Sequence, residues 1–143
     1  MMKMLSASIA RDRFAELRRE ALKGQEILIE DSKQLNSPLI SIISTELLDS
    51  LTDSFVFAPK WEEDEDGSLT VSLDEIDVIG YGETREEAAE VLATAASEYT
   101  ELYFSELSFY LSPMVNRLSH YPYLRRIARC SGDIAKVKKV LGV

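Results

Sequence analysis

The hydrophobic residues near the start of the chain recur at helical spacing. A short strand at residues 3–6 precedes this pattern, and Ser6 or Ser8 can cap the helix. Gly24 is expected to end the helix, because glycine adopts the left-handed conformation of a helix C-terminus without strain. The predicted apolar face consists of Ala10, Phe14, Leu17 and Ala21.

Two apolar runs follow the predicted helix. Residues 25–30 and 39–44 predict strands, and the second run is continuous enough to predict burial on both faces. Thr45 is expected to cap a short helix, and polar residues near 50–54 predict a boundary. The pattern therefore predicts a β-α-β-β-α domain over residues 1–53.

Alternating apolar and polar positions predict a second domain at residues 54–112. Residues 55–58, 69–73 and 78–82 are expected to form three strands. Asp66-Gly67 predicts a hairpin turn, because both residue types tolerate a positive φ.

A long helix is predicted to follow the third strand of this domain. Thr84-Arg85-Glu86-Glu87 has the form of a capping box, and the helical pattern continues as far as Leu111. Pro113 ends it, and residues 113–143 form three short helical patterns, the last capped by Asp133. The expected fold class is α+β. The long helix is expected to face the core with Ala88, Val91, Leu92, Ala95, Tyr99 and Leu102.

The composition is typical of a cytoplasmic protein. The chain has 143 residues, and 45% are hydrophobic, which is enough for one or two small cores. No apolar run approaches the roughly 20 residues of a membrane span, and the first six residues lack the apolar stretch of a signal peptide. The single cysteine, Cys130, excludes an intramolecular disulfide and a cysteine-based zinc site. We expect neither a bound metal nor a cofactor.

The net charge of −9 conceals a segregation of charge along the chain. Residues 1–45 hold seven basic and six acidic residues, residues 46–112 hold two and 18, and residues 113–143 hold seven and one, which accounts for all 16 basic and 25 acidic residues. An acidic middle segment between basic ends favours a cationic partner. Self-association through the basic tail, or a surface that only confers solubility, is also compatible with it.

Two stretches of the first domain carry a family pattern: Ala7-Ser8-Ile9-Ala10-Arg11-Asp12-Arg13-Phe14-Ala15-Glu16-Leu17 and Gly24-Gln25-Glu26-Ile27-Leu28-Ile29. They resemble the N-terminal domain of Phd/YefM-type (prevent-host-death) antitoxins. The resemblance implies a domain that dimerises and binds operator DNA, with Arg11 in the position of a DNA-contacting arginine. The chain departs from the pattern at Glu30-Asp31, where the family has a basic turn, and at Ile9, where it has a glutamate. The candidate DNA-binding residues are Lys3, Arg11, Arg13, Arg18 and Arg19.

The second domain carries a different pattern, in residues 62–76 and 80–88. An acidic Asp-Gly hairpin, an alternating strand and a Gly-Tyr-Gly-Glu-Thr-Arg-Glu-Glu-Ala helix start resemble the HicB antitoxins. This resemblance implies a β-β-β-α unit with a partial ribonuclease-H-like fold, which neutralises a small ribonuclease toxin. The candidate partner-binding residues are Glu62, Glu63, Asp64, Glu65, Asp66, Asp74, Glu75 and Asp77.

Other chemistry is weakly supported by the sequence. The acidic hairpin matches the first ligand positions of an EF-hand, but its twelfth position is Leu73, where calcium needs a bidentate glutamate. His120 has no partner at a catalytic spacing, and Cys130 is expected to be a half-buried helix residue. Residues 127–141 have the composition of a helix-turn-helix, but the turn is about one residue too short.

The sequence therefore predicts a non-enzymatic antitoxin of a toxin–antitoxin system. It would bind a small basic ribonuclease toxin, form a homodimer or a larger homo-oligomer, and regulate its own transcription through operator DNA. The alternatives are a dimeric DNA-binding regulator and an interaction module without a toxin.

Overall fold

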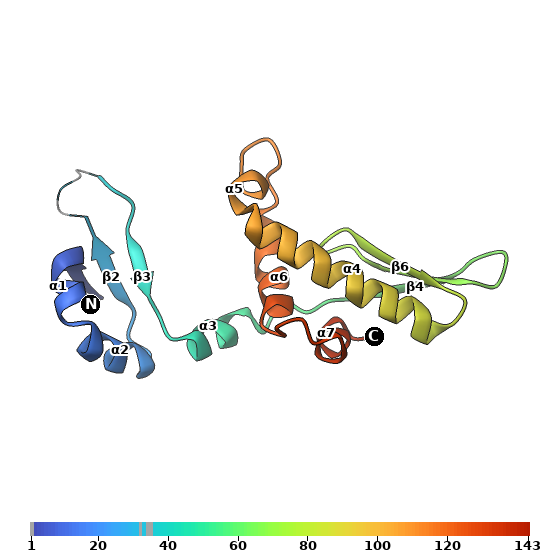
Figure 1. Cartoon of the computed structure of the whole chain (residues 1–143), viewed down its shortest axis with the longest axis horizontal. Helices are drawn as coiled ribbons and strands as arrows, with labels where there is room; N and C mark the ends of the chain where they lie inside the picture. Colours follow the sequence, from blue (N-terminus) through green and yellow to red (C-terminus); the bar gives the residue numbers. More distant parts are fainter. Residues whose placement is uncertain (1, 32, 34–35) are drawn as a thin grey trace. The chain divides into compact units, whose positions relative to one another are not determined.

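The computed structural model describes residues 2–31, 33 and 36–143. The chain divides into two compact units, Met1–Leu51 and Thr52–Val143, which are shown in Figure 1. Each unit contains one three-stranded sheet, so the protein is of the α+β class.

The first unit has a sheet in the order β1-β2-β3, with β1 parallel and β3 antiparallel to β2. Its small core consists of Ala10, Leu17 and Ile27, with Leu5, Ile29 and Ile42 packed against them. In chain order its elements are β1 (Lys3–Ser6), α1 (Ala7–Asp12), α2 (Phe14–Leu22), β2 (Ile27–Glu30), β3 (Ile40–Ile42) and α3 (Thr45–Thr52), the last ending in the second unit.

The first of the two helices expected in the first domain is divided in two. Arg13, at φ −111° and ψ 19°, leaves the helical conformation, and α2 starts at the next residue. Phe14, which was predicted to face the core, is instead 57% exposed. The side chains of Ala10, Leu17 and Ala21 are buried as predicted.

Two expectations about the end of this unit are wrong. Residues 39–44 do not form a strand buried on both faces: β3 has three residues at the sheet edge, and Ile40 is 65% exposed. An edge strand that pairs with one neighbour has little to bury it. Ser44 rather than Thr45 caps α3, because its hydroxyl accepts a hydrogen bond from the Leu47 N–H at 3.1 Å.

The second unit has an antiparallel sheet in the order β4-β5-β6, and α4 covers one of its faces (Figure 1). The alternation of residues 69–73 and 78–82 correctly predicts β5 and β6. In chain order the elements are β4 (Lys60–Glu63), β5 (Leu69–Leu73), β6 (Val78–Gly82), α4 (Arg85–Ser105), α5 (Leu107–Tyr110), the 3-10 helix η1 (Leu118–His120), α6 (Tyr121–Ala128) and α7 (Ile134–Leu141).

Glycine allows α4 to approach β6 closely. A Cβ atom on Gly80 would lie 2.4 Å from the Ala88 carbonyl oxygen, and one on Gly82 would lie 2.6 Å from the Ala88 nitrogen. Any side chain at either position would therefore push the helix away from the sheet. Thr84 caps α4 through the Glu87 N–H as predicted, while the Glu87 carboxylate accepts from the Glu83 N–H at 2.8 Å.

The long helix ends at Ser105, before the predicted limit of Leu111, and α5 follows after Glu106. Ala88 and Leu92 are in the core as expected, but Val91 and Leu102 are 44% and 47% exposed. The core also includes α4 residues that the pattern missed, because α6 and α7 cover a second side of the helix. These residues are Ala89, Ala93, Ala96, Thr100 and Tyr103.

The expected strand at residues 55–58 is absent. Arg126 donates to the Phe55 carbonyl oxygen at 2.7 Å, and the rings of Phe55 and Phe57 pack against Tyr123 of α6. The segment is therefore held as an extended strap on α6, not as part of the sheet. Residues 113–143 belong to the same compact unit as residues 54–112, since α6 and α7 pack on α4.

Candidate partner-binding surface

The acidic hairpin between β4 and β5 uses two of its carboxylates to hold its own turn. Asp66 accepts from the Ser68 N–H at 3.0 Å, and Asp64 accepts from the Thr70 hydroxyl at 2.9 Å. Hydrogen bonds from Ser68 lower the pKa of Asp66. With Gly67 at φ +84°, these bonds close the predicted turn, so Asp64 and Asp66 have a structural role.

The acidic residues of the loop between β5 and β6 are also engaged within the unit. Asp74 forms an ion pair with Lys60, and the hydrogen bond between them raises the pKa of Lys60. Glu75 accepts from the Ala58 N–H at 2.9 Å and so holds the end of the strap. Five of the eight candidate partner-binding residues, Asp77 included, therefore bond to their own chain.

Asp77 belongs to a polar cluster with Tyr99 of α4, Arg117 and His120. Its carboxylate lies 3.9 Å from Arg117 Nη1 and 3.8 Å from His120 Nε2. The Tyr99 hydroxyl lies 2.7 Å from His120 Nδ1 and accepts from Arg117 at 3.3 Å. Burial and the nearby Arg117 charge lower the pKa of His120, and burial raises the pKa of Tyr99. The cluster joins the β5–β6 loop to η1.

The remaining candidates, Glu62, Glu63 and Glu65, are exposed. Their carboxylates form no ion pair or hydrogen bond with the described residues. The bases of the acidic segment are occupied: Lys60 by Asp74, and Arg85 by the Trp61 ring, whose centroid lies 4.1 Å from the guanidinium carbon. The β4–β5 hairpin and the turn between β6 and α4 lie at the same end of the sheet. We call the free, exposed carboxylates there the acidic end: Glu62, Glu63, Glu65, Glu83 and Glu86.

Glu83 and Glu86 were missed as binding candidates because their sequence context is that of a helix cap. The signal that could have found them is the order of the strands. Glu63 pairs with Leu69, and Leu69 pairs with Gly82, so the β6–α4 turn begins beside the hairpin. Residues about twenty positions apart thus share one end of the sheet.

The face of the sheet opposite α4 exposes two apolar side chains on its edge strand β6. Ile79 and Tyr81 of β6 are 62% and 53% exposed, and Glu62 of β4 lies on the same face. Cross-strand register places Ser72 beside Ile79, and Thr70 between Glu62 and Tyr81. Within this unit, the sheet therefore presents exposed apolar side chains next to the acidic end.

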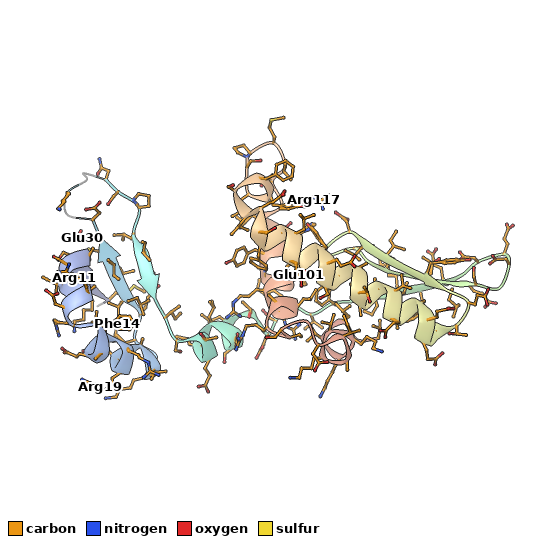
Figure 2. All side chains as sticks on the ribbon, viewed as in Figure 1. Arg11, Phe14, Arg19, Glu30, Glu101 and Arg117 are labelled. Carbon is orange, nitrogen blue, oxygen red and sulfur yellow. The ribbon has the colours of Figure 1, made fainter. Side chains whose placement is uncertain are left out.

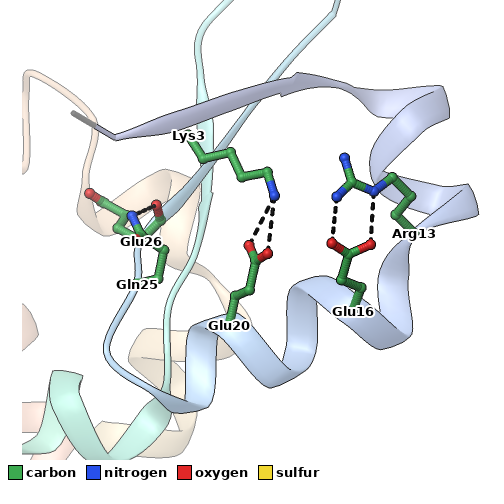
Figure 3. A network of polar contacts seen from close by, with 6 residues as sticks. All are labelled: Lys3, Arg13, Glu16, Glu20, Gln25 and Glu26. Carbon is green, nitrogen blue, oxygen red and sulfur yellow. Dashed lines mark hydrogen bonds and ion pairs between the residues drawn. The ribbon is translucent and has the colours of Figure 1, made fainter.

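In the first unit, two of the five candidate DNA-binding residues are held by carboxylates of α2 (Figure 3). Lys3 bonds both oxygens of Glu20 at 3.1 Å, and Arg13 bonds Glu16 at 2.6 and 3.0 Å. These bonds raise the pKa of Arg13 and lower that of Glu16. Both cations are therefore neutralised by residues of α2.

The other three candidates are exposed at the surface of α1 and α2. Figure 2 shows Arg11 and Arg19 among them, and Arg11 makes a 3.1 Å ion pair with its neighbour Asp12. Arg18 and Arg19 form no ion pair with the described residues. Glu30 pairs in register with Ser6, the N-cap of α1, so its carboxylate lies close to the start of that helix.

A scan against protein families identifies the class of the protein. The whole chain, residues 1–143, matches the PHD-like family, described as an antitoxin of the toxin–antitoxin, RelE/RelB, TA system. The chain belongs to this antitoxin family. One family thus spans both units, and the predicted antitoxin class is confirmed.

The fold of this antitoxin has a solved counterpart. A crystal structure from Syntrophomonas wolfei subsp. wolfei, described as the antitoxin part of a proposed toxin/antitoxin system, matches with a TM-score of 0.78. The two chains are 24% identical over 97% of this chain and 96% of that one. The likeness shows that the fold is shared along nearly the whole length. A search of curated proteins found no match.

In the described part of the antitoxin, no group of three or more His, Cys, Asp or Glu side chains could hold a metal ion. The helices of the same residues lack an apolar stretch of the length that would span a bilayer. The surfaces available to a partner include the acidic end, the exposed sheet face with Ile79 and Tyr81, and the free arginines of α2.

Proposed function

We propose that this antitoxin neutralises a small basic ribonuclease toxin by binding it through the second unit. The observation that carries the proposal is the acidic end, where five carboxylates remain free while Lys60 and Arg85 are occupied internally. A ribonuclease must attract RNA phosphates, so its active surface is basic. An acidic antitoxin can cover that surface and exclude the RNA. The antitoxin acts stoichiometrically and catalyses no reaction.

The test is the binding of the purified antitoxin to the protein encoded by the adjacent reading frame. We expect a complex whose association rate falls steeply as the ionic strength rises from 50 to 300 mM, because screening weakens long-range attraction. Replacement of Glu62, Glu63 and Glu65 by Gln should lower that rate by about tenfold at low salt.

Glu98→Gln, Glu101→Gln and Glu106→Gln form a matched control, since all three carboxylates are exposed and lie in the later part of α4 or just beyond it. This triple variant should change the association rate by less than about twofold. If the adjacent protein does not bind, or binds at a rate independent of salt, the proposal is wrong.

We further propose that the first unit forms a homodimer and holds operator DNA. The dimer is supported by Met4, which is 49% exposed on the face of the first sheet opposite its helices, and by Met2, which immediately precedes β1 and is 54% exposed. DNA binding is supported by the free, exposed guanidinium groups of Arg18 and Arg19 on α2. Together these properties would allow the antitoxin to regulate its own transcription.

A further inference from the structure

The two edges of the second sheet differ in how well they are protected. Exposed edge strands pair readily with other chains, and proteins usually block them with charges, prolines or bulges. The edge strand β4 is Lys60-Trp61-Glu62-Glu63, with three charges in four residues. The edge strand β6 is Val78-Ile79-Gly80-Tyr81-Gly82, which has no charge and no proline.

The hydrogen-bond register shows which backbone groups of β6 are free. The Asp64 N–H donates to the Ser68 carbonyl at 2.8 Å, so this pair bonds across the hairpin. Bonded and non-bonded pairs alternate in an antiparallel ladder, so Thr70 and Ser72 bond to β4. The backbone groups of the alternate residues of β5, Leu69, Val71 and Leu73, therefore bond to β6.

The corresponding residues of β6 are Val78, Gly80 and Gly82, all of them buried under α4. The N–H and C=O groups of Ile79 and Tyr81 consequently point away from β5, toward the open edge. They form no hydrogen bond with the described residues. The two residues with free backbone groups are also the two with exposed apolar side chains, 62% and 53% exposed.

We propose that the free edge of β6 receives a β-strand of the toxin, which extends the antitoxin sheet by one strand. Backbone bonds to Ile79 and Tyr81 supply the pairing, and apolar side chains of the added strand pack on these two residues. The inference rests on the proposed function, because it names the part of the antitoxin that the basic toxin contacts.

Charge decides between a toxin strand and a second copy of the antitoxin. Antiparallel pairing of two β6 strands about Gly80 would place Asp77 of each copy opposite Glu83 of the other, and like charges in direct opposition destabilise a sheet. A basic toxin strand instead meets the free carboxylate of Glu83 at one end of β6 and that of Asp77, which lies 3.9 Å from Arg117, at the other. The edge therefore fits a strand with an apolar centre and basic flanks.

The experiment is amide hydrogen exchange measured by NMR on the full-length antitoxin, alone and with the protein encoded by the adjacent reading frame. We expect the Ile79 and Tyr81 amides to exchange rapidly in the free antitoxin and to become protected in the complex.

Rapid exchange that persists in the complex would overturn the edge pairing and leave the proposed function intact. Protection in the free antitoxin that disappears on dilution would assign the edge to a second copy, and absence of a complex would overturn both proposals.

Two variants of one residue separate the backbone bond from the side chain. Ile79→Ala removes the apolar contact, and Ile79→Pro also removes the outward N–H, which bonds to nothing in the free antitoxin. We expect Ile79→Pro to bind the toxin about three- to tenfold more weakly than Ile79→Ala. Far-UV circular dichroism of both variants shows whether each is folded, so that a folding defect is not taken for a lost backbone bond. Equal affinities of the two Ile79 variants would refute the backbone pairing.

Discussion

His120 is the residue whose buried environment has the clearest consequence for stability. Its side chain is buried, with 6% of the residue exposed. Among the described residues, the titratable groups that face the imidazole are those of Tyr99, Asp77 and Arg117. Burial and Arg117 hold its pKa below the ordinary value of 6.5, and Asp77 opposes them only in part. The native state therefore favours the neutral ring, and the unfolded state binds the proton more tightly.

We expect the second unit to lose stability as the pH falls below about 6.5, at roughly 1.4 kcal/mol for each unit by which the folded pKa is depressed. The loss should be complete once the pH is below the folded pKa. Fluorescence of Trp61, the one tryptophan of the chain, reports the unfolding of this unit in urea at pH 7.5 and 5.5.

His120→Asn is the control, because its side-chain amide can replace Nδ1 as the partner of the Tyr99 hydroxyl and does not titrate. The variant should show a smaller difference in unfolding free energy between the two pH values. An equal difference in both proteins would assign the pH dependence to other groups.

The acidic residues show how far single side chains can be predicted from sequence. The sequence correctly indicates that the middle segment is acidic, since charge is a property of composition. It does not show that Asp77 meets Arg117, because that contact joins residues 40 positions apart and depends on where η1 packs. Only the strand register reveals that Glu83 and Glu63 share one end of the sheet.

The exposed arginines of helix α2 allow DNA binding to be tested. Arg18 and Arg19 are free and exposed, whereas Arg13 is held by both oxygens of Glu16. Replacing Arg18 and Arg19 by Ala should weaken binding to the DNA upstream of the gene and reduce the salt dependence of the affinity by about two in log–log slope. Gel-shift or fluorescence titrations at several salt concentrations provide the measurement.

Arg13→Gln is the matched variant from the same segment and should leave the salt slope unchanged, because Glu16 already neutralises that guanidinium. A slope that falls with Arg13→Gln but not with the α2 variant would place the DNA on another surface. Since Glu30 lies close to the start of α1, we expect phosphates to contact α2 and to avoid that end of α1.

The elements themselves were predictable where local chemistry alone determines them. The strict alternation of residues 69–73, the Asp66-Gly67 turn and the Thr84 and Asp133 caps all occur as expected. The strap at residues 55–58 was not predictable, because its aromatic residues suit a strand equally well. Tyr123 and Arg126 of α6, about seventy positions later, hold it away from the sheet.

The two units of the molecule differ greatly in the size of their buried apolar cores. The second unit has a core of fifteen buried residues, whereas the core cluster among the described residues of the first contains three. A unit of about fifty residues with so small a core is marginal without a partner. Its nearly balanced charge allows two copies to meet without strong repulsion.

We therefore expect the full-length antitoxin to be a dimer through the exposed face of the first sheet, and Met4→Glu to dissociate it. A carboxylate on that face would be buried against the partner copy, which weakens the dimer by tenfold or more. Sedimentation velocity over a concentration series measures the change, and far-UV circular dichroism checks that the variant is folded. The control is Ile9→Glu, which adds the same charge at a residue of α1 that is 45% exposed, close to the 49% of Met4. If Ile9→Glu dissociates the dimer and Met4→Glu does not, the two copies meet through their helices and the sheet face must serve another partner.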